Sequence, residues 1–144
     1  MFSKKYVPSN ISKRDKQKQI RMLTKSRKLY KKHKYYTRGK INYKNKKSGH
    51  VAKAFKLYNI KSMIPNKELA TKTGCSISAL KQIVKKGEGA YYSSGSRPNQ
   101  TPQSWGLARL ASAITSGKAS KVDYKIIEKG CNHKKKAFLM AQKN

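Results

Sequence analysis

An excess of positive charge limits what this chain can fold into more than any other feature of its sequence. Lys and Arg number 36 against five Asp and Glu, which gives a formal net charge of +31. Residues 1–61 contain 21 Lys and Arg against one acidic residue, hence +20, and residues 62–144 contain 15 against four, hence +11. Charge of this size opposes a compact state by self-repulsion. We therefore expect a negatively charged partner and a first segment that behaves as a basic arm.

The charge suits several kinds of partner. A nucleic-acid backbone fits because each Lys or Arg that neutralises a phosphate releases condensed counterions, and acidic protein surfaces or anionic membrane surfaces would also fit. No run of about 18 apolar residues is present to span a membrane, and the first residues, MFSKKYVPSN, lack the apolar segment of a secretory signal. We expect an intracellular or packaged protein in which Cys75 and Cys131 are both reduced.

Apolar periodicity and helix caps predict a mainly α protein in which a small helical domain follows an extended basic helical arm. The predicted division is a basic arm of helix and extended segments at 1–61, a compact helical domain at 62–130 and a basic tail at 131–144.

Within the arm, Ser12 is expected to cap a helix over residues 13–32. Residues 33–48 mix tyrosines with Lys and Arg, a composition typical of a loop that becomes ordered on binding rather than of a core. Ser48 then begins a short amphipathic helix that ends near Asn59.

Residues 66–86, NKELATKTGCSISALKQIVKK, resemble the DNA-binding helix-turn-helix. Asn66 and Ser76 are suited to cap two helices, and Gly74 permits the tight turn between them. The small or apolar residues that such a pair buries are Leu69, Ala70, Cys75, Leu80 and Ile83.

The exposed face of the second helix would carry Ser76, Ser78, Lys81, Gln82 and Lys85. Lys and Gln at these positions could reach phosphates or base edges, and Gln82 is the residue best suited to read a base. The alternative is a plain helical hairpin with solvated lysines, and we expect non-specific phosphate contact in preference to base reading.

The second helix is expected to end at Gly87, because residues 87–100 are rich in Gly, Ser, Pro and Asn and predict a loop. Long loops in small domains are often interaction sites, and this one offers Tyr91, Tyr92 and Arg97 to a phosphate or a protein partner.

Thr101 followed by Pro102 predicts the start of a further helix, which ends at Gly117. Trp105 is expected to anchor the core rather than to serve as a binding platform. Arg109 is expected to pair or cap locally.

The sequence contains no pattern typical of catalysis or metal binding. The five carboxylates are scattered singly, and Cys75, Cys131 and His133 lack zinc-finger spacing. The glycines at 87–89 and 117–118 lack the spacing of a phosphate-binding loop. We expect no enzyme activity, no metal, no cofactor and no small-molecule substrate.

The candidate residues for binding nucleic acid or a protein partner are cations, exposed tyrosines or members of the expected recognition helix. They are Arg14, Lys18, Arg21, Lys25, Arg27, Lys28, Tyr35, Tyr36, Arg38, Ser76, Ser78, Lys81, Gln82, Lys85, Tyr91, Tyr92 and Arg97. The tyrosines of the arm are expected to anchor the arm to the neighbouring domain in preference to stacking on bases.

Three stretches resemble a family of small uncharacterised proteins from large DNA viruses of eukaryotes: YVPSNISKRDKQKQIRMLTKSRKLYKK, YYTRGKI and GEGAYYSSGSRPNQTPQSWGLARLASAITSGKASKVDYKIIEKGC. The second half is also similar to a module in proteins of tailed phages, through Gly89, Arg97, Pro98, Thr101, Trp105, Ala108, Arg109, Leu110 and Ser112. The resemblance implies a viral origin and a location in the virion.

Two functions follow as expectations. The first is a non-enzymatic minor capsid protein of a large DNA virus, which bridges or cements major and other minor capsid proteins through its basic arm. Such a protein is found in the virion and, during assembly, in the host cytoplasm or nucleus. The alternative is a helix-turn-helix or non-specific DNA-binding protein that condenses or organises the viral genome.

Overall fold

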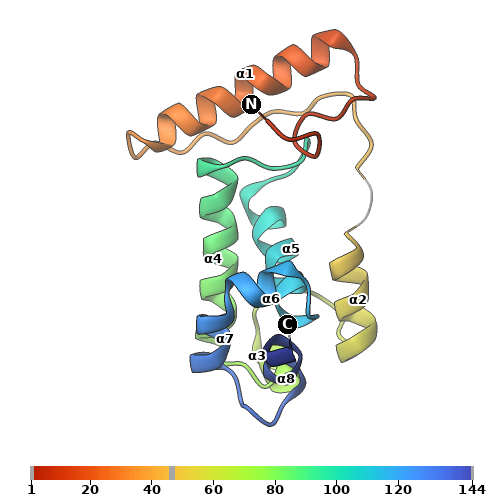
Figure 1. Cartoon of the computed structure of the whole chain (residues 1–144), viewed down its shortest axis with the longest axis vertical. Helices are drawn as coiled ribbons and strands as arrows, with labels where there is room; N and C mark the ends of the chain where they lie inside the picture. Colours follow the sequence, from red (N-terminus) through yellow and green to blue (C-terminus); the bar gives the residue numbers. More distant parts are fainter. Residues whose placement is uncertain (1, 46–47, 144) are drawn as a thin grey trace. The chain divides into compact units, whose positions relative to one another are not determined.

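The computed structural model describes residues 2–45 and 48–143, and the regular secondary structure in these two ranges is α-helical, as predicted. The helices, in chain order, are α1 (Lys13–Tyr30), α2 (Gly49–Tyr58), α3 (Lys67–Thr73), α4 (Ile77–Ser93), α5 (Pro102–Ile114), α6 (Lys118–Val122), α7 (Tyr124–Gly130) and α8 (Lys136–Lys143) (Figure 1). Among the described residues, no helix combines the length and the apolar character needed to cross a membrane.

The chain folds into two compact units, and each unit draws on two separate stretches of sequence. Unit 1 comprises Met1–Lys46 and Glu88–Trp105, and unit 2 comprises Lys47–Gly87 and Gly106–Asn144. Residues 2–45 therefore share a compact unit with a distant stretch of the chain, residues 88–105. The domain boundaries expected from the sequence, after residues 61 and 130, stay a prediction.

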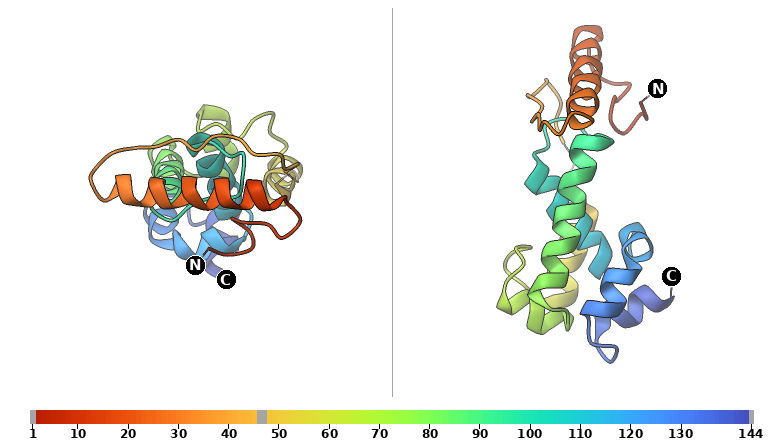
Figure 2. Two further views of the ribbon diagram at one scale, coloured as in Figure 1. Left: turned by 90° about the horizontal axis from the view of Figure 1, so that it is seen from above. Right: turned by 90° about the vertical axis from the view of Figure 1, so that its left-hand side faces the viewer.

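In unit 1, the chain after α1 turns back and runs beside that helix (Figure 2). α1 begins as predicted, because the Ser12 Oγ accepts a hydrogen bond from the backbone N–H of Asp15 at 3.1 Å. The returning segment is tied to the helix, for example by Lys18 Nζ, which donates to the carbonyl of Lys40 at 3.0 Å.

Arg38 lies inside unit 1, which corrects the expectation that it is free to bind a partner and that its segment has no core. Its side chain is 7% exposed. Nη1 donates to Ser26 Oγ at 2.8 Å and to the Tyr91 carbonyl at 2.9 Å, and Nη2 donates to Ser96 Oγ at 2.8 Å. The guanidinium also lies 3.8 Å from the centre of the Tyr91 ring. Burial lowers the pKa of Arg38 and Tyr91 opposes this shift, so the ring and the hydrogen bonds stabilise the buried charge.

Unit 2 has an apolar core to which α2, α3, α4, α5, α7 and α8 contribute. Its largest fully buried apolar side chains are Leu69, Leu80, Ile83, Leu110, Ile114 and Ile127. α2 follows the predicted Ser48 cap and ends at Tyr58, whose hydroxyl donates to the Ile114 carbonyl at 2.5 Å. Burial raises the pKa of Tyr58, because the phenolate would lose its solvation.

Cys75 and Cys131 form a disulfide, so the expectation that both are reduced is wrong. Both residues are buried, and residues 74–76 and 130–132 also exchange two backbone hydrogen bonds of 2.8 and 2.7 Å. The two cysteines are 56 residues apart in sequence. Sequence reasoning had no local spacing from which to infer this pairing.

α4 runs to Ser93, past Gly87 where the sequence predicted its end. A Cβ at Gly87 would lie 2.6 Å from Gly106 Cα, so this part of α4 packs closely on α5. A glycine weakens a helix by roughly 1 kcal/mol relative to alanine, and here tertiary packing overrides that preference. The predicted loop at 87–100 therefore begins only after Ser93, and Tyr91 belongs to the helix.

α5 begins as predicted, with reciprocal hydrogen bonds between Thr101 and Ser104. The Thr101 Oγ1 accepts from the Ser104 N–H at 3.0 Å, and the Ser104 Oγ accepts from the Thr101 N–H at 2.9 Å. Trp105 is half-buried and packs edge-on against Tyr6, with 6.3 Å between ring centroids. It lies outside the buried core, so the prediction that it anchors the core is wrong.

The described part of the predicted C-terminal tail is structured. α8 supplies Phe138 to the core of unit 2, and the ring of His133 stacks on that side chain at 3.9 Å between centroids.

Asp123 is buried and accepts hydrogen bonds from Arg109 Nε and Nη2, both at 2.8 Å, which confirms that Arg109 is paired. The side-chain hydrogen bond to this carboxylate raises the pKa of Arg109.

Gly87 and Gly89 provide a matched test of helix packing. In Gly89→Ala the added methyl meets no atom nearer than the Tyr30 hydroxyl at 4.0 Å, so improved helix propensity should raise the free energy of unfolding by roughly 0.5–1 kcal/mol. In Gly87→Ala the methyl overlaps Gly106, and overpacking should lower that free energy by about 1–3 kcal/mol. Denaturant unfolding followed by circular dichroism measures both changes, and equal stabilisation would contradict the close packing of α4 on α5.

Loss of the disulfide should destabilise unit 2. Replacing both cysteines, Cys75→Ala with Cys131→Ala, is expected to lower the free energy of unfolding by about 2–4 kcal/mol, because the unfolded chain is no longer restricted by the cross-link. A reductant should destabilise the native sequence similarly and leave the double variant unchanged. Unfolding of the native sequence that does not respond to the reductant would contradict the bond.

Candidate nucleic-acid interface

α3 and the first part of α4, both in unit 2, form the helix-turn-helix-like hairpin that the sequence predicts. Asn66 caps α3, with its Oδ1 accepting from the Leu69 N–H at 2.9 Å. Gly74 has a φ of 81°, in the left-handed region that favours glycine, and its N–H donates to the Ala70 carbonyl at 2.9 Å. Ser76 caps α4 through a 3.1 Å hydrogen bond from the Ala79 N–H.

The turn between the helices is held from several directions. The Thr73 hydroxyl donates to the Leu69 carbonyl at 2.7 Å and accepts from the Cys75 N–H at 3.2 Å. Cys75 is covalently joined to Cys131 at the end of α7. A Cβ at Gly74 would overlap the side chain of Lys135, so glycine is required both for its conformation and for space. The start of α4 is thereby fixed relative to α7.

One side of α4 is buried and the opposite side is polar and open. Ala79, Leu80 and Ile83 are buried in unit 2. The exposed side, which we call the α4 face, consists of Ser78, Lys81, Gln82 and Lys85. The positions i, i+3, i+4 and i+7 share one side of a helix, so the sequence-based choice of these residues agrees with their exposure. Ser76 is also exposed, but its hydroxyl is engaged as the helix cap.

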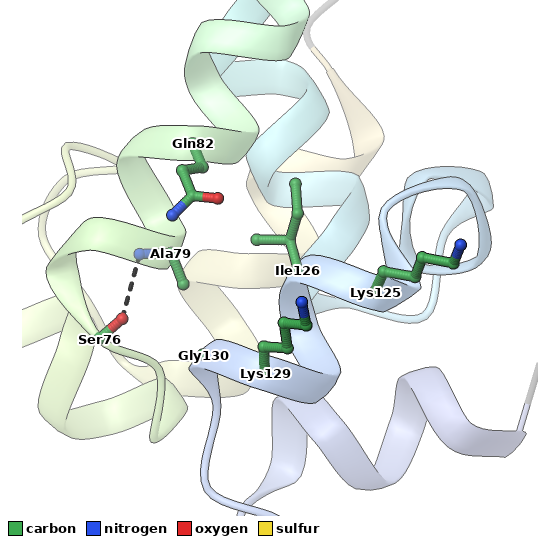
Figure 3. Close-up of a pocket in the computed structure, with 7 residues that line it drawn as sticks. All are labelled: Ser76, Ala79, Gln82, Lys125, Ile126, Lys129 and Gly130. Carbon is green, nitrogen blue, oxygen red and sulfur yellow. Dashed lines mark hydrogen bonds between the residues drawn. The ribbon is translucent and has the colours of Figure 1, made fainter.

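A groove of about 400 Å³ lies between α4 and α7 and adjoins the α4 face (Figure 3). α4 contributes Ala79 and Gln82 with the capping Ser76, and α7 contributes Lys125, Ile126, Lys129 and Gly130. Gly130 allows the close approach of the two helices, because a Cβ there would overlap that of Ala79.

Lys125 and Lys129 were missed by sequence reasoning. They are exposed and stand one turn apart on α7, so both belong to the same side of that helix. The i, i+4 spacing is visible in the sequence, but nothing local indicated that α7 lies beside α4. That proximity depends on the distant pairing of Cys75 with Cys131.

The groove and the α4 face together suit an anionic ligand. They present Lys81, Lys85, Lys125 and Lys129, and no carboxylate is among the residues that line the groove. Gln82 donates to Ser78 Oγ at 3.4 Å, a long hydrogen bond that a base edge or a phosphate could replace. In the described ranges, no three His, Cys, Asp or Glu side chains are grouped as metal ligands would be.

The candidate cations of α1 divide into exposed and engaged residues. Arg14, Lys18, Arg21, Lys25 and Lys28 are exposed, although Lys18 Nζ also donates to the Lys40 carbonyl at 3.0 Å. Arg27 is half-buried, and its Nε and Nη2 both donate to the Ser94 carbonyl, at 2.8 and 2.6 Å. Its guanidinium also lies 4.3 Å from the centre of the Phe2 ring, so Arg27 has a packing role within unit 1.

The remaining candidates differ sharply in exposure. Tyr35 is 70% exposed, whereas Tyr91 is fully buried and its hydroxyl accepts from the Arg38 N–H at 2.9 Å. Tyr36 and Tyr92 are half-buried, and Arg97 is exposed. Tyr91 was chosen as a loop residue open to partners, and its burial in α4 corrects that prediction.

Comparison with protein families identifies a match over most of the chain. A family of unknown function, DUF5824, matches residues 3–132 of this chain, a range that includes α1 to α7 and the disulfide. No curated protein and no solved structure matches this chain. The viral origin and the likeness to a phage module stay predictions. Because the match covers most of the chain, this protein belongs to the DUF5824 family of unknown function.

Proposed function

We propose that this protein acts by binding rather than by catalysis, and that unit 2 binds duplex DNA through the α4 face and the lysines of α7. The observation that carries the proposal is the α3–α4 hairpin, whose second helix turns Ser78, Lys81, Gln82 and Lys85 outward together. In helix-turn-helix proteins the second helix enters the major groove with such a face.

Most of the affinity in this proposal comes from phosphate contacts. Lys81 and Lys85 on α4 and Lys125 and Lys129 on α7 are all exposed and can each neutralise a phosphate. Such contacts set the position of the protein on the duplex but carry no sequence information. DNA phosphates would also be the negatively charged partner that a net charge of +31 leads us to expect.

Neutralising these four lysines tests the interface. The variant Lys81→Gln, Lys85→Gln, Lys125→Gln, Lys129→Gln should bind random duplex DNA about a hundredfold more weakly at moderate salt. The slope of log affinity against log salt should fall by about 0.9 for each lost contact. Fluorescence anisotropy of a labelled duplex, measured over a salt series, gives both quantities.

The matched control removes four exposed lysines from other parts of unit 2: Lys53, Lys56, Lys121 and Lys136, each changed to Gln. It has the same net charge as the first variant, so a generic effect of charge would weaken binding equally in both. The proposal requires the control to retain most of the affinity and most of the salt slope.

Gln82 is the residue proposed to read sequence. A Gln side chain can form two hydrogen bonds with adenine in the major groove, worth about 1–3 kcal/mol of discrimination. Gln82→Ala should therefore leave affinity for random duplex nearly unchanged and weaken binding to a selected site by about tenfold. Selection of sites from a random pool, followed by titration, makes the comparison. Equal losses on selected and random duplex would restrict α4 to phosphate contact.

A second candidate is a minor capsid protein of a large DNA virus that bridges or cements other capsid proteins. The resemblance noted in the sequence and the charge of +31 favour it. Residues 2–45 share a compact unit with 88–105, so in this proposal the basic segment docks as a folded body instead of threading as an extended arm. Its partners would be acidic surfaces of capsid proteins, in the virion or in the host cytoplasm or nucleus during assembly.

Salt dependence separates the two candidates. Binding to a candidate capsid protein that survives salt sufficient to abolish duplex binding would favour the structural role. Deleting the basic segment, residues 1–61, would not test the two candidates cleanly. The deletion removes α1 from unit 1 and α2 from the core of unit 2, so it would disrupt both units. Charge-neutralised, full-length variants avoid that problem.

A further inference from the structure

Five of the cations of α1 share one side of that helix. Arg14, Lys18, Arg21, Lys25 and Lys28 follow one another at alternating intervals of four and three residues, and all are exposed. Such positions lie within a narrow stripe on a helix. The buried residues of α1, Gln19, Met22, Leu23 and Ser26, lie outside this stripe. We call these five cations the α1 stripe.

One residue of the α1 stripe, Lys25, contacts a tyrosine of the segment that follows α1. Lys25 Nζ lies 4.5 Å from the centre of the Tyr36 ring, which connects the stripe to the segment that runs back beside α1. The next side chain, Tyr35, contacts the rings of Tyr30 and Tyr92, with centroids 6.1 and 5.1 Å away. These contacts position the Tyr35 ring, yet the residue remains 70% exposed.

Tyr35 is exposed, whereas Tyr91 and Tyr58, which have clear packing roles, are buried. Tyr91 is buried and engages Arg38, and Tyr58 is buried and donates to the Ile114 carbonyl. An aromatic ring that is held by its neighbours but left open to solvent loses little conformational entropy when a flat ligand stacks on it. Tyr35 therefore has the properties of a stacking platform, and it directly precedes Tyr36, whose ring contacts Lys25 of the α1 stripe.

We propose that the α1 stripe and Tyr35 form a binding site for single-stranded nucleic acid in unit 1. The stripe would bind successive phosphates, and an unpaired base would stack on the Tyr35 ring. Proteins that bind single strands without sequence preference combine these two elements, a cationic track and aromatic side chains. A duplex offers phosphates but keeps the faces of its bases paired and stacked, so it suits the stripe without using Tyr35.

This site is distinct from the duplex interface proposed for unit 2, and neither proposal depends on the other. Substitutions at Tyr35 should leave the unit 2 contribution to duplex affinity unchanged. The four-lysine variant of α4 and α7 should retain the preference for bases described next. Failure of one proposal can therefore be recognised independently of the other.

The test compares a short labelled oligothymidine with an abasic oligonucleotide of equal length and charge. The native protein should bind the oligothymidine about tenfold more tightly than the abasic strand, because only the former can stack. Tyr35→Leu should remove this preference while leaving affinity for the abasic strand unchanged. Tyr35→Phe keeps the ring and should retain the preference. Because Tyr35→Leu also removes the ring contacts with Tyr30 and Tyr92, binding is measured well below the unfolding transition of each variant.

The stripe is tested with Arg14→Gln, Arg21→Gln and Lys28→Gln in one variant, against a control with Lys4→Gln, Lys40→Gln and Lys44→Gln. The stripe variant should bind both oligonucleotides more weakly by the same factor, with a salt slope lower by about 0.7 for each contact. The control should retain most of the affinity.

Two results would overturn the proposal. One is a native protein that binds the two oligonucleotides equally. The other is a preference for bases that persists in Tyr35→Leu. Either result would leave the exposed ring without a role in stacking and would favour a protein partner for this surface, since tyrosine is also enriched at protein interfaces.

Discussion

Mutual repulsion among 36 Lys and Arg side chains, opposed by five carboxylates, acts against the compact state of this chain. Some arginines nevertheless lie half-buried or buried, among them Arg27, Arg38 and Arg109. Arg109 pairs with the buried carboxylate of Asp123, and Arg38 is stabilised by neutral oxygens and the ring of Tyr91. Many of the other cations are exposed, and the α1 stripe and the α4 face collect several of them. An anionic ligand bound by the folded chain would both relieve this repulsion and stabilise the fold by linkage.

Local sequence patterns predicted much of the secondary structure because helix caps are local interactions. Ser12, Ser48, Asn66 and Ser76 each cap the helix that the sequence assigned to them. The hairpin of α3 and α4 was predictable for the same reason, since Gly74 adopts the left-handed conformation that a tight turn needs. The mainly α fold class follows from these elements.

Features that depend on distant contacts could not be predicted. Gly87 lies inside α4, where it packs closely on Gly106. From the sequence alone, a glycine followed by a stretch rich in Gly and Ser predicts the end of a helix. The link between Cys75 and Cys131 likewise depends on the fold. Arg38 was counted among the surface cations because its burial partners, such as Ser96, lie far along the chain.

The candidate site shows the same division. The α4 face was predictable because its members repeat with the period of a helix, whereas Lys125 and Lys129 join it only through the packing of α7 beside α4. Tyr35 and Tyr91 have the same side chain in similar basic and aromatic surroundings, yet one is exposed and the other is buried. Exposure depends on packing. Composition could therefore indicate both tyrosines as candidate binding residues, but it could not show which one is exposed.

The most direct test of the account is lysine footprinting, in which the acetylation rate of each lysine is measured by mass spectrometry with and without a saturating short duplex. We predict strong protection of Lys81, Lys85, Lys125 and Lys129, while Lys53 and Lys136 on other helices of unit 2 remain reactive. Uniform weak protection of all lysines, or no protection on α4 and α7, would contradict the proposal that this face binds DNA.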